Sequence, residues 1–157
     1  MDETIIREPL KTIPKSGMAL HIQKVPVNRV AQMWSLVSPF LLDGLERGQV
    51  TRQDYTIDQA KALLCRGDWQ LIVAHDETGA IYGACAVEFI YRPNDCVAFV
   101  PTLGGRGIVC NENGEQFFQL LRECGATTLE VACRKSAARL FSTAGLTDKH
   151  MILEKAL

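Results

Sequence analysis

The sequence predicts a mixed α/β fold, with a central mixed sheet of about six strands and helices on both of its faces. Three observations lead to this prediction. The chain has 157 residues, a length that suits one domain with a hydrophobic core. Its middle part consists of strand-like runs joined by tight turns, as in antiparallel hairpins. Its last third alternates strand-like runs with helical patterns, and parallel neighbouring strands require such crossover helices.

Residues 1–17 are expected to form an extended N-terminal arm. They mix charged residues with Pro9 and Pro14 and show no helical period. A segment of this kind fits a groove on a neighbouring protein better than it fits a core. Residues 18–157 are therefore expected to form the single folded domain, with the arm as a contact to partners.

The domain begins with an alternating pattern over residues 18–25, which predicts a strand. Pro26 precedes a helix whose apolar residues recur at helical spacing as far as Leu41. Pro39 is expected to kink or split this helix, because proline cannot donate the internal hydrogen bond. A second short helix follows, with Asp58 as its expected N-cap.

Three strands and a turn follow these helices. Residues 69–75 and 81–91 are expected to pair through a hairpin turn at 76–79, where Gly79 suits the left-handed position. A third strand is expected over residues 96–102. The remaining elements, in chain order, are a glycine turn at 104–107, a helix ending at Gly125, a strand at 128–133, a helix at 136–144 closed by Gly145, and a final strand at 150–157.

The balance of charges gives no reason to expect a nucleic-acid or membrane partner. The chain has 17 basic and 18 acidic residues, so no excess of positive charge favours nucleic acid or a membrane surface. No apolar run approaches the ~18 residues needed to span a bilayer. The acidic N-terminus lacks the apolar core of an export signal, and we expect the protein to remain in a cytoplasm.

The six cysteines do not indicate a metal site. None forms a Cys-x-x-Cys pair, and the three histidines are scattered along the chain. The expectation is buried, reduced thiols and no bound metal.

The C-terminal third resembles the GNAT superfamily of acyl-CoA-dependent N-acyltransferases. The resemblance lies in the alanine-rich run at 137–146, which stops at a glycine, and in the strand-like run at 151–155. Together with the order of elements it covers residues 18–157. From Asp95 onward the chain is also similar to short GNAT-like proteins of tailed bacteriophages, which are common among virion and morphogenesis genes.

The resemblance implies a place for coenzyme A. In the superfamily a strand ends in a glycine-rich turn, whose amide groups and following helix bind the pyrophosphate. Thr102 stands where the family has glutamine or arginine. The cofactor-binding residues that the resemblance implies are Leu103, Gly104, Gly105, Arg106 and Gly107.

Two features near this turn oppose tight binding of a pyrophosphate. The spacing of Asn113 and Gln116 predicts a capping box, which would occupy the amide groups at the start of the next helix. Glu112 and Glu115 would repel an anion there, although Arg106 offsets one of these charges. The expectation is therefore that no cofactor binds, or that acetyl-CoA binds if the enzyme is active.

The catalytic side of the resemblance is incomplete. Family enzymes often have a tyrosine general acid in the alanine-rich helix, and the matching residue here is Phe141, which has no proton to donate. The asparagine that often precedes this helix is replaced by Lys135 or Ser136. Glu88 is the candidate general base, although a lone glutamate on a strand more often faces solvent. The weaker candidates are Tyr91 and His75.

Two main hypotheses follow. The favoured one is a catalytically impaired GNAT-like domain that acts as a structural or binding module, in a bacteriophage virion or its assembly (neck, tail or internal). Its partners would be other virion proteins bound through residues 1–17, with self-association left open, in the host cytoplasm or in the virion. The alternative is an active acetyl-CoA-dependent N-acetyltransferase of a small-molecule or protein amine. A third, an inhibitor that mimics the partner of a host protein, stays open.

Overall fold

The computed structural model describes residues 20–48, 54–109 and 113–157. Its sheet has five strands in the order β1-β2-β3-β4-β5, antiparallel from β1 to β4 and parallel between β4 and β5. The strands are β1 (His21–Val25), β2 (Gln70–His75), β3 (Ile81–Tyr91), β4 (Cys96–Gly105) and β5 (Thr128–Val131). The helices are η1 (Val27–Arg29), α1 (Val30–Gly48), α2 (Ile57–Arg66), α3 (Gly114–Glu123) and α4 (Lys135–Thr143). The prediction of a mixed α/β fold is confirmed.

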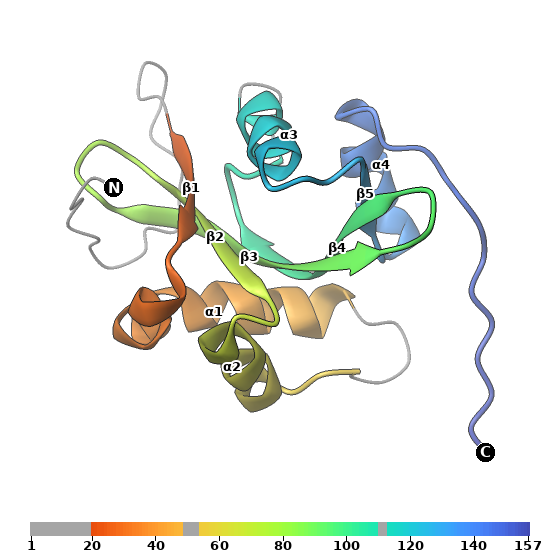
Figure 1. Cartoon of the computed structure of the whole chain (residues 1–157), viewed down its shortest axis with the longest axis horizontal. Helices are drawn as coiled ribbons and strands as arrows, with labels where there is room; N and C mark the ends of the chain where they lie inside the picture. Colours follow the sequence, from red (N-terminus) through yellow and green to blue (C-terminus); the bar gives the residue numbers. More distant parts are fainter. Residues whose placement is uncertain (1–19, 49–53, 110–112) are drawn as a thin grey trace.

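The helices cover the two faces of the sheet in separate pairs (Figure 1). The first pair, α1 and α2, packs on one face and buries a cluster that we call the α1/α2 core. The second pair, α3 and α4, packs on the opposite face over the α3/α4 core. Alternate residues of β3 divide between these cores, since Ala84 and Ala86 belong to the first and Cys85 and Val87 to the second.

Helix α1 is not split at Pro39, which was one of the two outcomes expected there. It runs for 19 residues and passes through both Pro39 and Gly44. Packing explains the glycine: a Cβ atom at Gly44 would lie 2.2 Å from the Thr102 side-chain oxygen of β4. The Thr102 hydroxyl in turn donates a hydrogen bond of 2.7 Å to the Leu41 carbonyl oxygen. Tertiary contact with β4 therefore holds this helix together across a residue that weakens isolated helices.

Helix α2 is capped by Thr56, so the assignment of its N-cap to Asp58 was wrong. The Thr56 side-chain oxygen accepts a hydrogen bond from the Gln59 backbone at 3.2 Å, and the Gln59 side chain accepts one from the Thr56 backbone at 2.9 Å. This reciprocal capping box satisfies two backbone donors. Asp58 instead lies in the first helical turn, where its charge complements the helix dipole.

The final strand predicted over residues 150–157 is absent. No regular structure follows α4 in the described residues, and the segment extends away from the body (Figure 1). The sheet therefore has five strands, where about six were expected. The apolar residues Met151, Ile152 and Leu153 are consecutive, so a strand here would present apolar side chains to both faces and would need cover on both.

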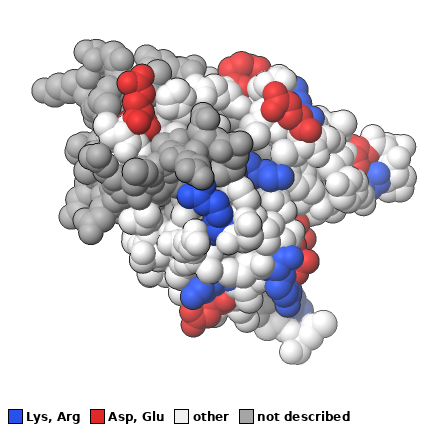
Figure 2. Space-filling view, turned by 60° about the vertical axis from the view of Figure 1, so that its left-hand side comes forward, with Lys and Arg blue, Asp and Glu red and all other residues white. Residues whose placement is uncertain are grey.

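The remaining predictions have mixed outcomes. Residues 1–17, the proposed arm, lie outside the described residues. Five described cysteines are free thiols, of which Cys85 and Cys96 are buried as expected, whereas Cys65 is exposed. In the described part of the chain, no group of three or more acidic, histidine or cysteine side chains could hold a metal ion, and none of the helices could cross a membrane. Basic and acidic side chains are both scattered over the described surface of one face (Figure 2).

Candidate functional site

The two parallel strands of the sheet pair along the whole of β5 but along only part of β4. Residues 97–100 of β4 pair with residues 128–131 of β5, and the Thr127 hydroxyl joins the start of β5 to the Cys96 backbone at 3.0 Å. Beyond this point β4 continues to Gly105 and pairs only with β3 among the described strands. We call the place where β5 ends and β4 continues alone the β4–β5 divergence. Ligands of open α/β sheets commonly bind outside such carboxyl ends.

A β-bulge lies where the divergence begins. In the pairing of β3 with β4, Val100 and Pro101 together oppose the single residue Val87. Proline suits this position because it has no N–H to donate to the ladder. The extra residue exchanges the two faces of β4, so that Thr102 turns to α1 while Leu103 packs against the α3/α4 core. A proline inside a strand pattern is a signal of a bulge that sequence analysis could have used.

The glycine segment at 104–107 is a continuation of β4 followed by a bend, where a turn was expected to begin at Gly104. Its glycines allow close packing. A Cβ atom at Gly104 would lie 1.8 Å from the Phe40 carbonyl oxygen of α1, and one at Gly107 would lie 2.5 Å from the Leu20 side chain. Gly105 has φ of +75°, which favours glycine on conformational grounds as well. Contacts within the protein therefore account for these three glycines.

Leu103, just before these glycines, and Arg106, between them, differ in exposure. Leu103 is half-buried against the α3/α4 core, whereas Arg106 is exposed. The Arg106 backbone N–H donates a hydrogen bond of 2.8 Å to the Tyr82 carbonyl oxygen, so this amide is already paired. The Arg106 guanidinium group has no ion pair with a described residue. It is the cationic side chain that the segment offers to an anion.

The capping box predicted at the start of α3 does not form. The Asn113 side chain makes no capping hydrogen bond to the helix. Gln116 reaches β1 instead: its Nε2 donates to the Leu20 carbonyl oxygen at 3.1 Å, and its Oε1 accepts from the Ile22 backbone at 3.4 Å. The first-turn amide groups of α3 are thus not occupied by the side chain expected to take them.

Repulsion of an anion at this helix start is also weaker than the sequence indicated. Glu115 forms an ion pair of 2.7 Å with Arg122, and this pair partly neutralises its charge. Glu112, the second carboxylate that we expected to repel a pyrophosphate, lies outside the described residues.

Glu88 lies beside the bulge, and its charge acts on Tyr55. It follows Ala84 and Ala86 at the spacing of alternate residues, so it faces the α1/α2 side, where it is half-buried. Burial raises the pKa of Tyr55, and the charges of Glu88 and then Asp54 raise it further. The charge of Glu88 therefore acts on the Tyr55 hydroxyl. Sequence analysis missed this electrostatic coupling because 33 positions separate the two residues in the chain.

The weaker candidates lie away from the divergence. His75 is buried on β2, and its two ring nitrogens lie 2.9 Å from the Asp76 carbonyl oxygen and 2.9 Å from the Gln23 side-chain oxygen. The whole of β3 separates this strand from β4. Tyr91 is 79% exposed and pairs with Cys96, at the opposite end of β4 from Gly105. Among the sequence candidates, Glu88 is the one that the register places next to the bulge.

Helix α4 presents no strong proton donor in place of Phe141. The Phe141 ring is buried in the α3/α4 core. The following hydroxyls, of Ser142 and Thr143, donate to carbonyl oxygens one turn earlier in their own helix. Lys135 and Ser136 begin the helix and are exposed. Helix α4 therefore has a buried hydrocarbon ring where the family often has a tyrosine.

Comparison with known proteins finds similarity in structure alone. No family model matches this chain, and no curated protein matches its sequence.

Solved acetyltransferases share the architecture along most of their length. An aminoglycoside acetyltransferase from an uncultured soil metagenomic sample is 14% identical, with a TM-score of 0.60 over 88% of this chain and 95% of its own. An aminoglycoside N-acetyltransferase in complex with CoA is 11% identical, with a TM-score of 0.59 over 92% and 99%. A predicted acetyltransferase from Clostridium acetobutylicum, solved with acetyl-CoA, is 13% identical, with a TM-score of 0.56 over 88% and 96%. The chain therefore has the fold of the GNAT acetyltransferases.

Proposed function

We propose that this chain is a GNAT-fold domain with impaired catalysis, which acts as a structural or binding module. The observation that carries the proposal is the burial of Phe141 in the core. Acyl transfer from a thioester releases a thiolate, and a nearby general acid assists this step. The only tyrosines of the chain are Tyr55, Tyr82 and Tyr91, and none of them lies on α4.

The glycine segment supports the same proposal. Its glycines are accounted for by contact with α1 and Leu20, and the amide of Arg106 is paired with Tyr82. A loop that binds a pyrophosphate needs several free amide groups pointing at one place. The packing of this segment thus explains the glycine pattern without a bound anion.

A second candidate function, that of an active acetyl-CoA-dependent N-acetyltransferase, is favoured by a different observation. Glu88 is half-buried on the α1/α2 side, and the register places it beside the β4 bulge, where it could accept the proton of an amine. The residues present also fit a CoA in part, since Arg106, the α3 N-terminus and the β4–β5 divergence could hold it. When bound, acetyl-CoA would supply the acyl group as a thioester. Its acceptor would be a small-molecule or protein amine.

The proposed setting is a bacteriophage virion or its assembly, as a neck, tail or internal component. The proposal rests on the resemblance in pattern, from Asp95 onward, to short GNAT-like proteins of tailed bacteriophages. We further propose that residues 1–17 bind other virion proteins, in the host cytoplasm or in the assembled particle, with no nucleic-acid or membrane partner. Deletion of residues 1–17 tests this. Loss of assembly with retained folding would support the arm as an anchor, and unchanged assembly would contradict it.

Calorimetric titration with acetyl-CoA, combined with an assay of thiol release in the presence of amines, separates the two functions. The impaired module is expected to show no binding at millimolar ligand and no amine-dependent thiol release. Micromolar binding with turnover would overturn the proposal. Turnover that is lost in Glu88→Gln, but kept in the control Glu123→Gln on the far end of α3, would establish the second candidate.

A further inference from the structure

Three side chains from neighbouring strands form a row across one face of the sheet. Glu88 of β3 lies opposite Phe99 of β4, and Phe99 lies opposite Glu130 of β5. Residues directly opposite each other on paired strands point to the same side of the sheet. Because Glu88 alternates with Ala84 and Ala86, this is the α1/α2 side. We call Glu88, Phe99 and Glu130 the β3–β5 row.

The ring in the middle of the row belongs to neither core. Phe99 is half-buried, yet it does not pack against the buried residues of the α1/α2 core or of the α3/α4 core. Helix α1 packs against β3 and β4, and no helix of the described residues makes comparable contact with β5. An aromatic ring outside the cores offers apolar surface to a ligand.

Glu88 supplies a negative charge without a partner at one end of the row. Its carboxylate is half-buried and forms no ion pair or hydrogen bond with the side chains of the described ranges. The charge acts within the fold, since it raises the pKa of Tyr55 after burial has raised it most. Removing a carboxylate from water without a cation is unfavourable, and a cationic ligand would relieve this cost.

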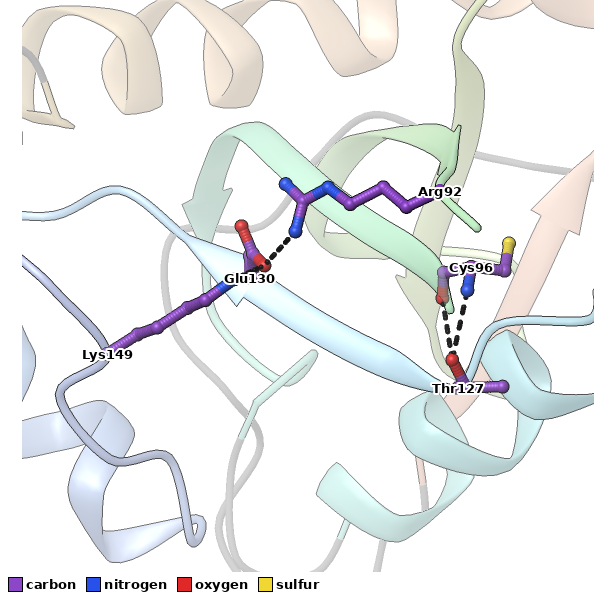
Figure 3. A network of polar contacts seen from close by, with 5 residues as sticks. All are labelled: Arg92, Cys96, Thr127, Glu130 and Lys149. Carbon is purple, nitrogen blue, oxygen red and sulfur yellow. Dashed lines mark hydrogen bonds and ion pairs between the residues drawn. The ribbon is translucent and has the colours of Figure 1, made fainter. Parts of the chain in front are cut away.

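The other end of the row carries an excess of positive charge (Figure 3). The Glu130 carboxylate lies 2.7 Å from the Lys149 ammonium group and 3.1 Å from the Arg92 guanidinium group, so two cations face one anion. The Lys149 and Arg92 side chains are 52% and 40% exposed. Each has more N–H donors than one carboxylate contact uses. This end can therefore bind an anionic group of a ligand.

We propose that the β3–β5 row binds a small amine that also carries a carboxylate. Its ammonium group would lie at Glu88, and its hydrocarbon chain over Phe99. Its carboxylate would lie at Lys149 and Arg92. The two ends are two strands apart, about 10 Å at about 4.8 Å between neighbouring strands, so a short hydrocarbon chain must separate the charges. The proposal deepens the second candidate function and rests on it only for turnover, because binding itself requires no acetyl-CoA.

Titration with 6-aminohexanoate, followed by the amide signals of the full chain in nuclear magnetic resonance, tests the site. The signals of the β3–β5 row are expected to shift at millimolar ligand. Hexylamine, which lacks the carboxylate, should bind about threefold more weakly, as expected for the loss of exposed ion pairs. Hexanoate, which lacks the ammonium group, should bind about tenfold more weakly, because Glu88 is half-buried. Equal binding of hexylamine and 6-aminohexanoate, or no shift in the row, would overturn the proposal.

Matched variants assign the two ends. Glu88→Gln should weaken the binding of 6-aminohexanoate about tenfold, and Lys149→Gln should weaken it about threefold while leaving hexylamine unchanged. The controls Glu123→Gln and Lys155→Gln make the same changes of charge at exposed residues outside the row and should bind as the original chain does. If either row variant bound 6-aminohexanoate as tightly as its control, the proposed orientation would be wrong.

A thiol-release assay with acetyl-CoA separates this proposal from the second candidate function. If the chain is active, 6-aminohexanoate should have a lower KM than hexylamine. Binding at the row without thiol release would support the site and contradict the acetyltransferase. Thiol release without a preference between the two amines would support the acetyltransferase and contradict the site.

Discussion

Gly104 shows how a single residue can have a structural role that its motif hides. The glycine lies at the point where α1 approaches β4 most closely, and a Cβ atom there would lie 1.8 Å from a backbone oxygen of Phe40. A helix backbone cannot withdraw from this contact without shifting the whole helix. The glycine pattern at 104–107 thus reflects packing between α1 and β4.

We expect Gly104→Ala to destabilise the fold by about 1–3 kcal/mol or more, as overpacking in a core does. Gly114→Ala is the matched control, because a Cβ atom there meets only Phe118 at an ordinary 3.9 Å. Alanine is also the better helix former, by about 1 kcal/mol. Urea unfolding of both variants measures the difference. Equal stability of the two would show that α1 does not depend on this contact.

Asp76 organises the turn between β2 and β3 from a buried position. Its carboxylate accepts hydrogen bonds from the backbone and hydroxyl of Thr78 at 2.8 and 2.7 Å, from the Ala80 backbone at 3.1 Å and from the Tyr82 hydroxyl at 3.1 Å. Burial alone would raise the pKa of Asp76, but these hydrogen bonds outweigh it and lower the pKa. The turn therefore holds a charged carboxylate within the fold.

Tyr82→Phe removes one of these donors without changing the shape of the ring. We expect a loss of about 1.5–3 kcal/mol in the free energy of unfolding, because a hydrogen bond to a charged group disappears inside the protein. Tyr91→Phe, at a ring that is 79% exposed, should have no measurable effect. A thermal or urea titration at neutral pH compares them. If the free energy of unfolding of Tyr82→Phe equals that of the original chain, the other hydrogen-bond donors to Asp76 compensate for the lost hydroxyl.

At the scale of elements, local sequence signals predicted turns and helix ends correctly where only neighbouring residues take part. Gly79 has φ of +86° in the hairpin turn, and Gly125 and Gly145 have φ of +98° and +95° after their helices, as their positions predicted. Glycine is needed at these positions because of backbone geometry alone. Such features can be found from sequence since no distant residue takes part in them.

Helix caps were harder to predict, because a polar side chain at a helix start can bond either to the helix itself or to a distant part of the chain. Thr56 and Gln59 form a capping box around α2, whereas the similar spacing of Asn113 and Gln116 does not form one at α3. Gln116 bonds to β1 instead, a partner more than 90 positions away. A tertiary contact thus overrides the local motif in the second case and not in the first.

Thr56→Ala should cost about 1 kcal/mol of stability, the usual effect of removing an N-cap. Asp58→Ala removes only a favourable charge from the first helical turn and should cost less. Chemical denaturation of the two variants checks the order. If Asp58→Ala were the more harmful, the N-cap would belong to that residue after all.

Across the whole molecule, the sequence was sufficient for the class of fold and for the order of its elements. It was not sufficient for the site. Glu88 could be singled out as a lone acid on a strand, but Tyr55, whose pKa its charge raises, comes from the approach to α2. The bulge at Pro101 reverses the faces of β4, so the roles of Thr102 and Leu103 follow from pairing that no local pattern encodes. The final strand predicted over residues 150–157 does not form, and no strand of the described residues pairs with that segment.

Acid should weaken the whole fold through two carboxylates. The hydrogen bond from Lys149 lowers the pKa of Glu130 most, burial opposes it, and Arg92 lowers it further; the pKa of Asp76 is lowered as well. Both folded values lie below the unfolded ones, which are about 4.3 and 3.9. Their stabilisation is therefore present above about pH 5 and is lost as the pH falls through the folded values.

Unfolding free energies measured from neutral pH into acid should show this decline, and Glu130→Gln should make it shallower. Glu123→Gln, an exposed carboxylate on α3, is the comparison and should leave the slope unchanged. An identical slope in both variants would mean that the Lys149 and Arg92 contacts with Glu130 do not persist in solution.

The amide group of Gln116 acts on β1 much as a further strand would, since it offers one donor and one acceptor to the outer backbone. Gln116 thus occupies one carbonyl and one N–H at the start of this edge strand. Backbone groups that a side chain already holds cannot pair with another molecule, so this end of β1 is a poorer template for edge-to-edge association.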